Sequence, residues 1–317
     1  MAVAMDRVVL RVVVLALLAV SLVPAFLGWA LIRSYAGIPA APARLIGELR
    51  LSESEPLGFV QGIAVSDSGE VFAADQGGRK LVALSDSVSP GTVLASYPQL
   101  QLSAPQAVAL GPDGAVYLLD KGTGVVSVID RQGNVERFLK ICAPGCTALA
   151  IDNAGRIYSA DAASGALRRF LPSGDPDLTW GATQPGATVV GPIVGLILID
   201  GLAYATTGRT IVRLDGIGRV VLRRPLLGNG GMLGRGPFGT LLMSDMTMDS
   251  PGPRWQTFRV WVLDREGRPI GRVVGPDGRD NLFDQPRGIA VGPLDRIYVA
   301  NGSRVSVYQP EKRWTTS

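Results

Sequence analysis

The sequence predicts an all-β domain, built from six similar four-stranded units, that follows one apolar helix at the amino terminus. Three observations lead to this prediction. The 317-residue chain contains 40 Gly and 22 Pro, a composition typical of many short strands joined by turns. A pattern of strand, tight turn and strand recurs along the chain, and an uncharged apolar run of 21 residues precedes the first copy.

The apolar run is "VVVLALLAVSLVPAFLGWALI", residues 12–32. As a helix it would extend about 30 Å, enough to cross the hydrocarbon core of a bilayer. Trp29 and Tyr35 lie where interfacial aromatic residues are expected. We therefore predict a transmembrane signal anchor over residues 1–36. The alternative is a cleaved signal peptide, because "APA" at 41–43 offers small residues for cleavage.

A repeated unit fills most of the remaining chain. Each copy has a short apolar strand, a turn rich in Gly, Asp, Pro or Asn, and a strand with an aromatic residue. Four clear copies are "QGIAVSDSGEVFAAD" (61–75), "QAVALGPDGAVYLLD" (106–120), "TALAIDNAGRIYSAD" (147–161) and "RGIAVGPLDRIYVAN" (287–301). Gly62 and Ala107, at the same place in two copies, are 45 residues apart, the period expected of a propeller blade.

Two weaker copies, over 194–224 and 240–275, bring the predicted units to six. The last unit ends after "RVSVYQP" (304–310) without a fourth strand, whereas "LIGELRL" (45–51) precedes the first unit and has strand character. Pairing these two segments would close a ring and remove an open sheet edge. The sequence thus predicts a six-bladed β-propeller with one amino-terminal transmembrane helix. Its predicted parts are an anchor (1–36), a linker (37–44), the propeller (45–310, with 45–51 closing the last blade) and a tail (311–317).

The segment "GPDGRDNLFDQPRGIAVGPLDRIYVANGSRVSVY" (275–308) resembles the NHL-repeat family of β-propellers. It has a Gly-rich lead-in, Phe and Pro, then Gly-Ile-Ala-Val, an aromatic strand and Arg-Val-x-Val-Tyr. The resemblance extends over residues 45–310 and is weak in the fourth and fifth units. It implies a propeller fold, and the Ala-, Gly-, Arg- and Val-rich composition suggests a membrane-anchored protein of a bacterium.

The chain contains no histidine, which removes the commonest general base and the commonest metal ligand. Ser-His-Asp triads, His-ligated zinc and haem with a proximal His are therefore excluded within this chain. The 31 basic and 27 acidic residues are interspersed, with a formal net charge of +4, so we expect no nucleic-acid partner. No cofactor is predicted.

Cys142 and Cys146 are the only cysteines and lie in "CAPGC". A tight Pro-Gly loop could bring their sulfurs together, so the alternatives are a local disulfide in an oxidising compartment and two free thiols. The cysteine pair favours an amino terminus inside the cell and a propeller outside it. We therefore predict a single-pass protein of the bacterial cytoplasmic membrane, attached through residues 12–32, with a periplasmic or extracellular propeller.

Long connections are expected on one face of the propeller, which we call the long-loop face. It carries the loops from the second to the third strand of each blade and the connections between blades. Its long segments are 52–60, 141–146, 174–192, 246–256 and 276–286. Long loops on a rigid scaffold usually carry recognition, and adaptable apolar residues are common at contact surfaces. The candidate binding residues on this face are Phe59, Met246, Met248, Trp255, Asp280 and Phe283.

An acidic or amide residue ends the second strand in five units: Asp75, Asp120, Asp161, Asp245 and Asn301. These residues could form a polar ring at the pore, or each could cap its own turn by binding backbone N–H groups. Asp200-Gly201 is expected to form a two-residue hairpin turn rather than a metal site.

We predict from these features a non-catalytic protein that binds a protein partner or ligand through its long-loop face. It would act as a scaffold or accessory subunit of a membrane complex, or as a sensor or adaptor. The alternative is a metal-dependent hydrolase or lyase that acts at the central pore through carboxylates.

Overall fold

The computed structural model describes residues 37–85, 91–96, 99–226, 228–248, 256–279, 282–283 and 285–311, without the side chains of 246–248 and 256–257. The chain divides into two units, Met1–Pro39 and Ala40–Ser317. No helix within the described ranges is long and apolar enough to span a bilayer. The predicted membrane segment 12–32, with Trp29 and Tyr35, lies outside those ranges.

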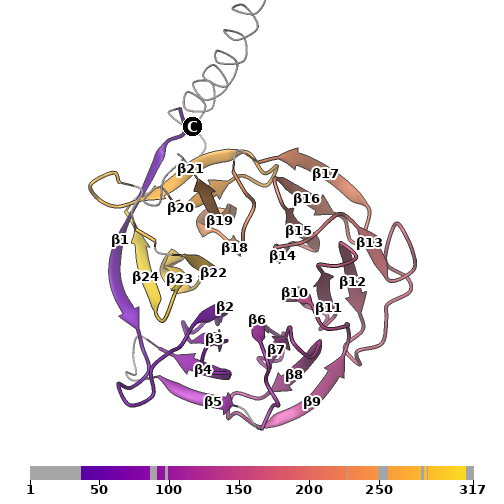
Figure 1. The fold of residues 1–317 in the computed structure, drawn as a ribbon. Coiled ribbons are helices and arrows are strands. Elements are labelled where there is room, and N and C mark those ends of the chain that lie inside the picture. Colours follow the sequence, from indigo (N-terminus) through magenta and orange to yellow (C-terminus); the bar gives the residue numbers. More distant parts are fainter. Residues whose placement is uncertain are drawn as a thin grey trace, which may run out of the picture. The chain divides into compact units, whose positions relative to one another are not determined.

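The second unit is all-β, and its described helices are two three-residue 3₁₀ turns, Pro237–Gly239 and Pro293–Asp295. Four sheets each contain four consecutive antiparallel strands (Figure 1). The first two comprise β2 (Val60–Val65), β3 (Val71–Asp75), β4 (Lys80–Leu84) and β5 (Thr92–Ser96), then β6 (Pro105–Leu110), β7 (Val116–Asp120), β8 (Val125–Ile129) and β9 (Val135–Lys140). The next two comprise β10 (Cys146–Ile151), β11 (Ile157–Asp161), β12 (Ala166–Phe170) and β13 (Ala187–Val189), then β14 (Gly195–Ile199), β15 (Leu202–Thr207), β16 (Thr210–Leu214) and β17 (Val220–Pro225).

An eight-stranded sheet completes the unit, in the order β18-β19-β20-β21-β1-β24-β23-β22. Its strands are β18 (Leu233–Arg235), β19 (Leu241–Met248), β20 (Gln256–Leu263), β21 (Pro269–Val274), β1 (Ala40–Leu49), β22 (Pro286–Val291), β23 (Ile297–Asn301) and β24 (Val305–Pro310). Residues 43–49 of β1 pair antiparallel with β24, as expected of the segment 45–51. The strand begins at Ala40, inside the predicted linker, because residues 40–42 also pair in parallel with β21.

The sheets stand around a central axis, with the first strand of each group of four nearest the axis and the last strand at the rim (Figure 1). Successive first strands contact one another around the whole ring, in the order β2, β6, β10, β14, β18, β22 and back to β2. This radial arrangement of sheets is that of a β-propeller.

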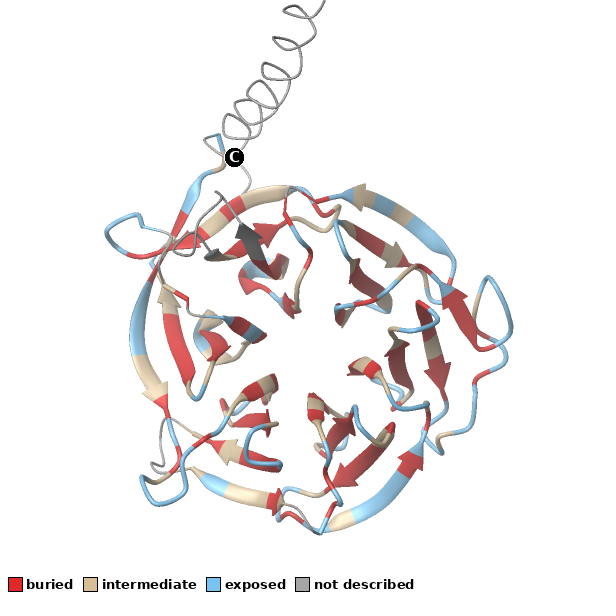
Figure 2. Ribbon diagram, in the orientation of Figure 1, coloured by how far each residue is buried: buried red, intermediate tan, exposed pale blue. Residues whose placement is uncertain are grey.

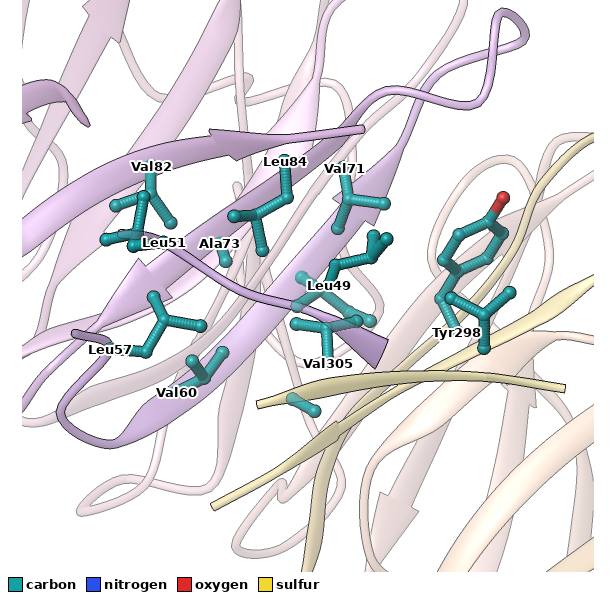
Figure 3. Close-up of a cluster of buried hydrophobic side chains, with 13 residues drawn as sticks. Leu49, Leu51, Leu57, Val60, Val71, Ala73, Val82, Leu84, Tyr298 and Val305 are labelled. Atoms are coloured by element: carbon teal, nitrogen blue, oxygen red, sulfur yellow. The ribbon is translucent and has the colours of Figure 1, made fainter. Parts of the chain in front are cut away.

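Burial follows the position of each strand in its sheet (Figure 2). The second strands β3, β7 and β23 are buried at every residue, since neighbouring sheets cover both of their faces. The rim strand β17 is largely exposed. One apolar cluster joins the first sheet to the last: Leu49 and Leu51 from the amino-terminal side pack near Val71, Leu84 and Val305 (Figure 3).

Short turns on the face opposite the long-loop face repeat one local chemistry. In the turn 152–156, Asp152 Oδ1 accepts hydrogen bonds from the backbone N–H groups of Ala154 and Arg156, both at 2.9 Å. Gly155 adopts a φ of +74°, which an L side chain rarely adopts. The turns 215–219 and 264–268 use the same Asp-to-backbone bonds. Asp and Gly at fixed spacing therefore specify these turns locally.

The predicted hairpin turn at Asp200-Gly201 is confirmed, with φ of +52° and +76° between β14 and β15. The placement of the long connection 174–192 is wrong for most of its length. Residues 171–186 join β12 to β13, a connection from a third to a fourth strand, so they belong to the opposite face. The reason is that the short fourth strand, β13, lies near the end of this segment, so only residues 190–192 belong to the connection between blades.

Candidate functional site: a central pocket on the long-loop face

A pocket of about 390 Å³ lies at the centre of the ring. Residues at the beginnings of β2, β6, β10 and β22 line it, together with the connections that lead into β14 and β18 and with Phe258 of β20. Its volume falls within the range of about 300–1,000 Å³ that is common for small-molecule sites. Every group of four strands, or the connection that leads into it, thus contributes to one cavity.

Hydrogen bonds identify the face on which the pocket opens. The N–H of Gln76, in the turn between β3 and β4, donates to the Phe59 carbonyl at 2.9 Å. In the next sheet the N–H of Lys121 donates to the Ala104 carbonyl at the same distance. Turns from second to third strands therefore share a face with the connections that precede first strands. The pocket residues follow those connections directly, so the pocket belongs to the long-loop face.

A β-bulge occurs at the beginning of four first strands. The pairing register shifts between Val60 and Gly62, and equivalent shifts occur in β6, β10 and β22. The bulged residues all line the pocket: Gln61, Gln106, Thr147 and Arg287. Bulges change the direction of a side chain relative to regular pairing. Here they gather amide, hydroxyl and guanidinium groups around a single cavity.

Asp245 is the one carboxylate, and Arg287 the one cation, among the described residues that line the pocket. Asp245 is only 2% exposed. Its Oδ1 accepts a hydrogen bond from the Asn229 N–H at 2.9 Å, and its Oδ2 accepts one from Trp261 Nε1 at 3.0 Å. The Arg287 side chain is exposed and lies over the Phe59 ring, 5.6 Å from its centroid. Among the described residues that line the pocket, the accessible charge is therefore positive.

The channel narrows below the pocket to a space of about 60 Å³, lined by small and apolar residues of the first strands. A Cβ atom at Gly62 would lie 2.7 Å from the Gln106 carbonyl oxygen, and one at Gly288 would lie 2.9 Å from the Ile63 nitrogen. Neighbouring first strands approach each other too closely there for any side chain. The central channel therefore has an apolar, tightly packed lower part.

Asp75 and Asp120, which end the second strands of the first two sheets, act as caps. Asp75 accepts hydrogen bonds from the N–H groups of Gly58, Phe59 and Gly78 at 2.8–3.0 Å. Asp120 accepts equivalent bonds from Ser103, Ala104 and Thr123. Each of these two carboxylates thus joins a connection between blades to a turn, whereas the Asp161 carboxylate, among the described residues, bonds only to Ala163 and Ser164 in its own turn. Within the described ranges, no group of three or more His, Cys, Asp or Glu residues could hold a metal ion.

The predicted binding residues fall into four groups. Phe59 is half-buried beside the pocket residue Arg287. Met246 and Met248 lie on β19, where Met246 pairs with the pocket residue Phe258 of β20. Trp255 and Asp280 lie outside the described residues.

Phe283, the remaining predicted binding residue, is 5% exposed. Its ring packs edge-to-face on Tyr308, with 5.4 Å between the centroids. It therefore fills the core and offers a ligand little surface.

The sequence prediction missed the bulged residues of the pocket. A signal for them is present in the repeat, since Gln61, Gln106, Thr147 and Arg287 each stand directly before the small residue that opens an apolar strand. A polar residue at one fixed position of an otherwise apolar template indicates a position that the core does not use. Only the three-dimensional structure shows that these positions are bulged and that they line one pocket.

The structure joins Cys142 and Cys146 in a disulfide, with 6.5 Å between their Cα atoms. Cys146 begins β10 and directly precedes the pocket residue Thr147. The N–H of Gly145 donates to the Lys121 carbonyl at 2.8 Å. The disulfide loop is thus fixed to the neighbouring blade at the wall of the pocket.

No model of a known protein family matches this chain, and no curated protein matches it. Solved structures do. A gluconolactonase from Xanthomonas campestris is 15% identical, with a TM-score of 0.59 over 86% of this chain and 99% of that one. A virginiamycin B lyase from Staphylococcus aureus is 13% identical, with a TM-score of 0.57 over 83% and 98%. The WD40 β-propeller domain of Doa1 is 11% identical, with a TM-score of 0.58 over 86% and 99%. At these identities the likeness shows the fold alone, which is a β-propeller.

Proposed function

We propose that this chain is an NHL-like, six-bladed β-propeller that binds a protein partner or ligand without catalysis. Binding would use the central pocket and the surrounding long-loop face. The observation that carries the proposal is the pocket of about 390 Å³ to which bulged polar residues of four first strands contribute. A rigid ring of sheets that presents variable side chains around one cavity is suited to recognition.

The blade count of six rests on the sheet pairing. Four sheets have four strands each, and the eight-stranded sheet can be divided into two groups of four. One group is β18–β21, and the other is β22–β24 with β1 at its rim. In this interpretation β1 supplies the strand that the carboxy-terminal blade lacks.

The chemistry of the pocket supports binding over the alternative of a metal-dependent hydrolase or lyase. Both oxygens of Asp245 already accept hydrogen bonds from the protein. The narrow channel below the pocket is lined by small and apolar residues. A histidine-to-alanine variant of the S. aureus virginiamycin B lyase is catalytically inactive. The present chain has no histidine, so it cannot use that residue.

Attachment to the bacterial cytoplasmic membrane through residues 12–32, with the propeller outside the cytoplasm, is part of the proposal. The disulfide between Cys142 and Cys146 supports an oxidising compartment. Such a protein would serve as a scaffold subunit of a membrane complex, or as a sensor or adaptor.

Photo-crosslinking in cells tests the proposal. A photoreactive amino acid is introduced into the full chain at Gln106 or at Val194, which line the pocket. Gln132 is the control, because it is exposed in the turn from β8 to β9 on the opposite face. Adducts from the two pocket positions, and none from Gln132, are expected. Adducts from Gln132 alone would contradict the proposal.

A further inference from the structure

The bulged position of the first strands determines the polar chemistry of the pocket. A bulge is a property of backbone pairing, so it constrains the side chain at that position weakly. The four bulged residues here are two amides, one hydroxyl and one guanidinium: Gln61, Gln106, Thr147 and Arg287. Across the four blades they comprise three residue types, with Gln at two positions and Thr and Arg at one each, while the surrounding strand template stays the same. The position therefore sets specificity rather than stability.

The amides at this position suit a ligand with peptide groups. Each Gln side chain offers both N–H donors and a carbonyl acceptor. Gln61 Nε2 donates to Gln76 Oε1 at 3.0 Å, which leaves the Gln61 carbonyl oxygen for a ligand. Gln106 is half-buried, and its side chain has no hydrogen-bond partner among the described residues. A peptide backbone supplies a donor and an acceptor at every residue, as these amides require.

The guanidinium of Arg287 suits an anion. No carboxylate within the described ranges forms an ion pair with it, and its partner is the Phe59 ring. Arg presents parallel N–H donors that match the two oxygens of a carboxylate. Asp245 does not neutralise this charge at the surface, since it is buried and hydrogen-bonded on both oxygens.

An apolar wall completes the pocket. Pro192, Ile193 and Val194 lie side by side in the connection that leads into β14, and Phe258 and Pro286 also line the cavity. Val194 is 40% exposed. Such a surface accepts an aliphatic or aromatic side chain, and burying that side chain gains free energy in proportion to the apolar area removed from water.

We infer that the pocket binds the carboxy-terminal residues of a peptide that ends in an apolar residue. Arg287 binds the terminal carboxylate, Gln61 and Gln106 bind backbone amides, and the wall around Val194 receives the last side chain. This inference rests on the proposed function, because it names the class of ligand for the same pocket. A fatty acid offers the same carboxylate but has no groups for the amides.

The test uses the full chain, purified in mild detergent, and fluorescein-labelled tetrapeptide pools that end in Leu, Ile, Val or Phe. Fluorescence anisotropy compares the free acids with the corresponding carboxamides, and unlabelled octanoate is tested as a competitor. The free acids are expected to bind at least about tenfold more tightly than the carboxamides, as a charge-assisted hydrogen bond predicts. Octanoate is expected to compete poorly.

Variants locate the effect. Arg287→Gln should reduce the affinity for the acids to that for the carboxamides, whereas Arg287→Lys should keep part of the difference. Val194→Trp should block the pocket and weaken the binding of the acids. Ile217→Trp is its matched control, because Ile217 is also an exposed aliphatic residue (53%, against 40% for Val194) and lies in the turn between β16 and β17 on the opposite face. Thermal unfolding of both Trp variants at the temperature of wild type shows that folding is intact.

Equal affinity of wild type for acids and carboxamides would overturn the inference, and so would an absence of peptide binding or a strong preference for octanoate. None of these outcomes alters the crosslinking from Gln106 and Val194. Loss of that crosslinking would instead overturn the proposed function itself.

Discussion

Replacing Arg169 with Met is expected to destabilise the propeller by about 3–5 kcal/mol, the usual cost of removing one partner of a buried ion pair. Arg169 lies on β12 and is 4% exposed. Its Nε and Nη2 donate to Asp177 Oδ2 at 2.8 and 2.7 Å. Its Nη1 donates to the Gly216 carbonyl at 3.0 Å, so the guanidinium joins two neighbouring blades.

The magnitude comes mainly from the carboxylate that the substitution leaves behind. Asp177 is 5% exposed, and after the change it keeps only the hydrogen bonds from the Thr179 N–H and hydroxyl. The Trp180 ring, 5.6 Å from the guanidinium carbon, also loses a cation–π contact. The double variant Arg169→Met/Asp177→Leu removes both charges and replaces them with apolar groups. It should recover most of the lost stability.

Urea and thermal unfolding of the full chain in mild detergent measure these differences. The single variant should lower the Tm by on the order of 10 °C, and hydrogen exchange should increase in 171–186 and around Gly216. A single variant within about 1 kcal/mol of wild type would refute the reasoning. A double variant less stable than the single variant would also refute it, because the cost would then come from packing and not from an uncompensated charge.

Three further predictions concern acid stability, ring closure and capping. Burial raises the pKa of Asp177, but the bonds from Thr179 and the charge of Arg169 outweigh it and hold the pKa below its ordinary value. This contribution to stability is therefore present above about pH 4 and lost as the pH falls through the folded pKa. Below about pH 4, urea unfolding should therefore show that wild type loses stability relative to the Arg169→Met/Asp177→Leu variant. Leu49→Ala should cost about 2–5 kcal/mol, because Leu49 is buried between the first and last sheets, whereas Ile46→Ala, at a position 38% exposed, should change the urea midpoint little. Asp120→Ala should leave the N–H groups of Ser103 and Ala104 without their acceptor, which hydrogen exchange at those two amides would detect; unchanged exchange would show that water replaces the carboxylate at no cost.

The sequence alone determined the repeat. Short apolar strands and turns with Asp and Gly at fixed spacing depend on chemistry within a few residues, so 61–75 and 106–120 reveal strands and turns directly. Counting the strands also exposed a missing one, and the segment 45–51 lies within the strand that pairs with β24. The two three-residue strands, β13 and β18, are too short to show a period. For this reason the sequence places most of the connection 174–192 on the wrong face.

Only the tertiary structure decided which side chains form the pocket. Gln61 and Arg287 stand near opposite ends of the chain, and they meet because the ring closes and because a bulge shifts the register of each strand. A bulge depends on how one strand pairs with the next, and no periodicity within a single strand encodes it. The burial of a side chain also depends on contacts between distant segments. Phe283 lies in a polar segment with the composition of a binding loop, yet its ring packs against Tyr308 of another strand.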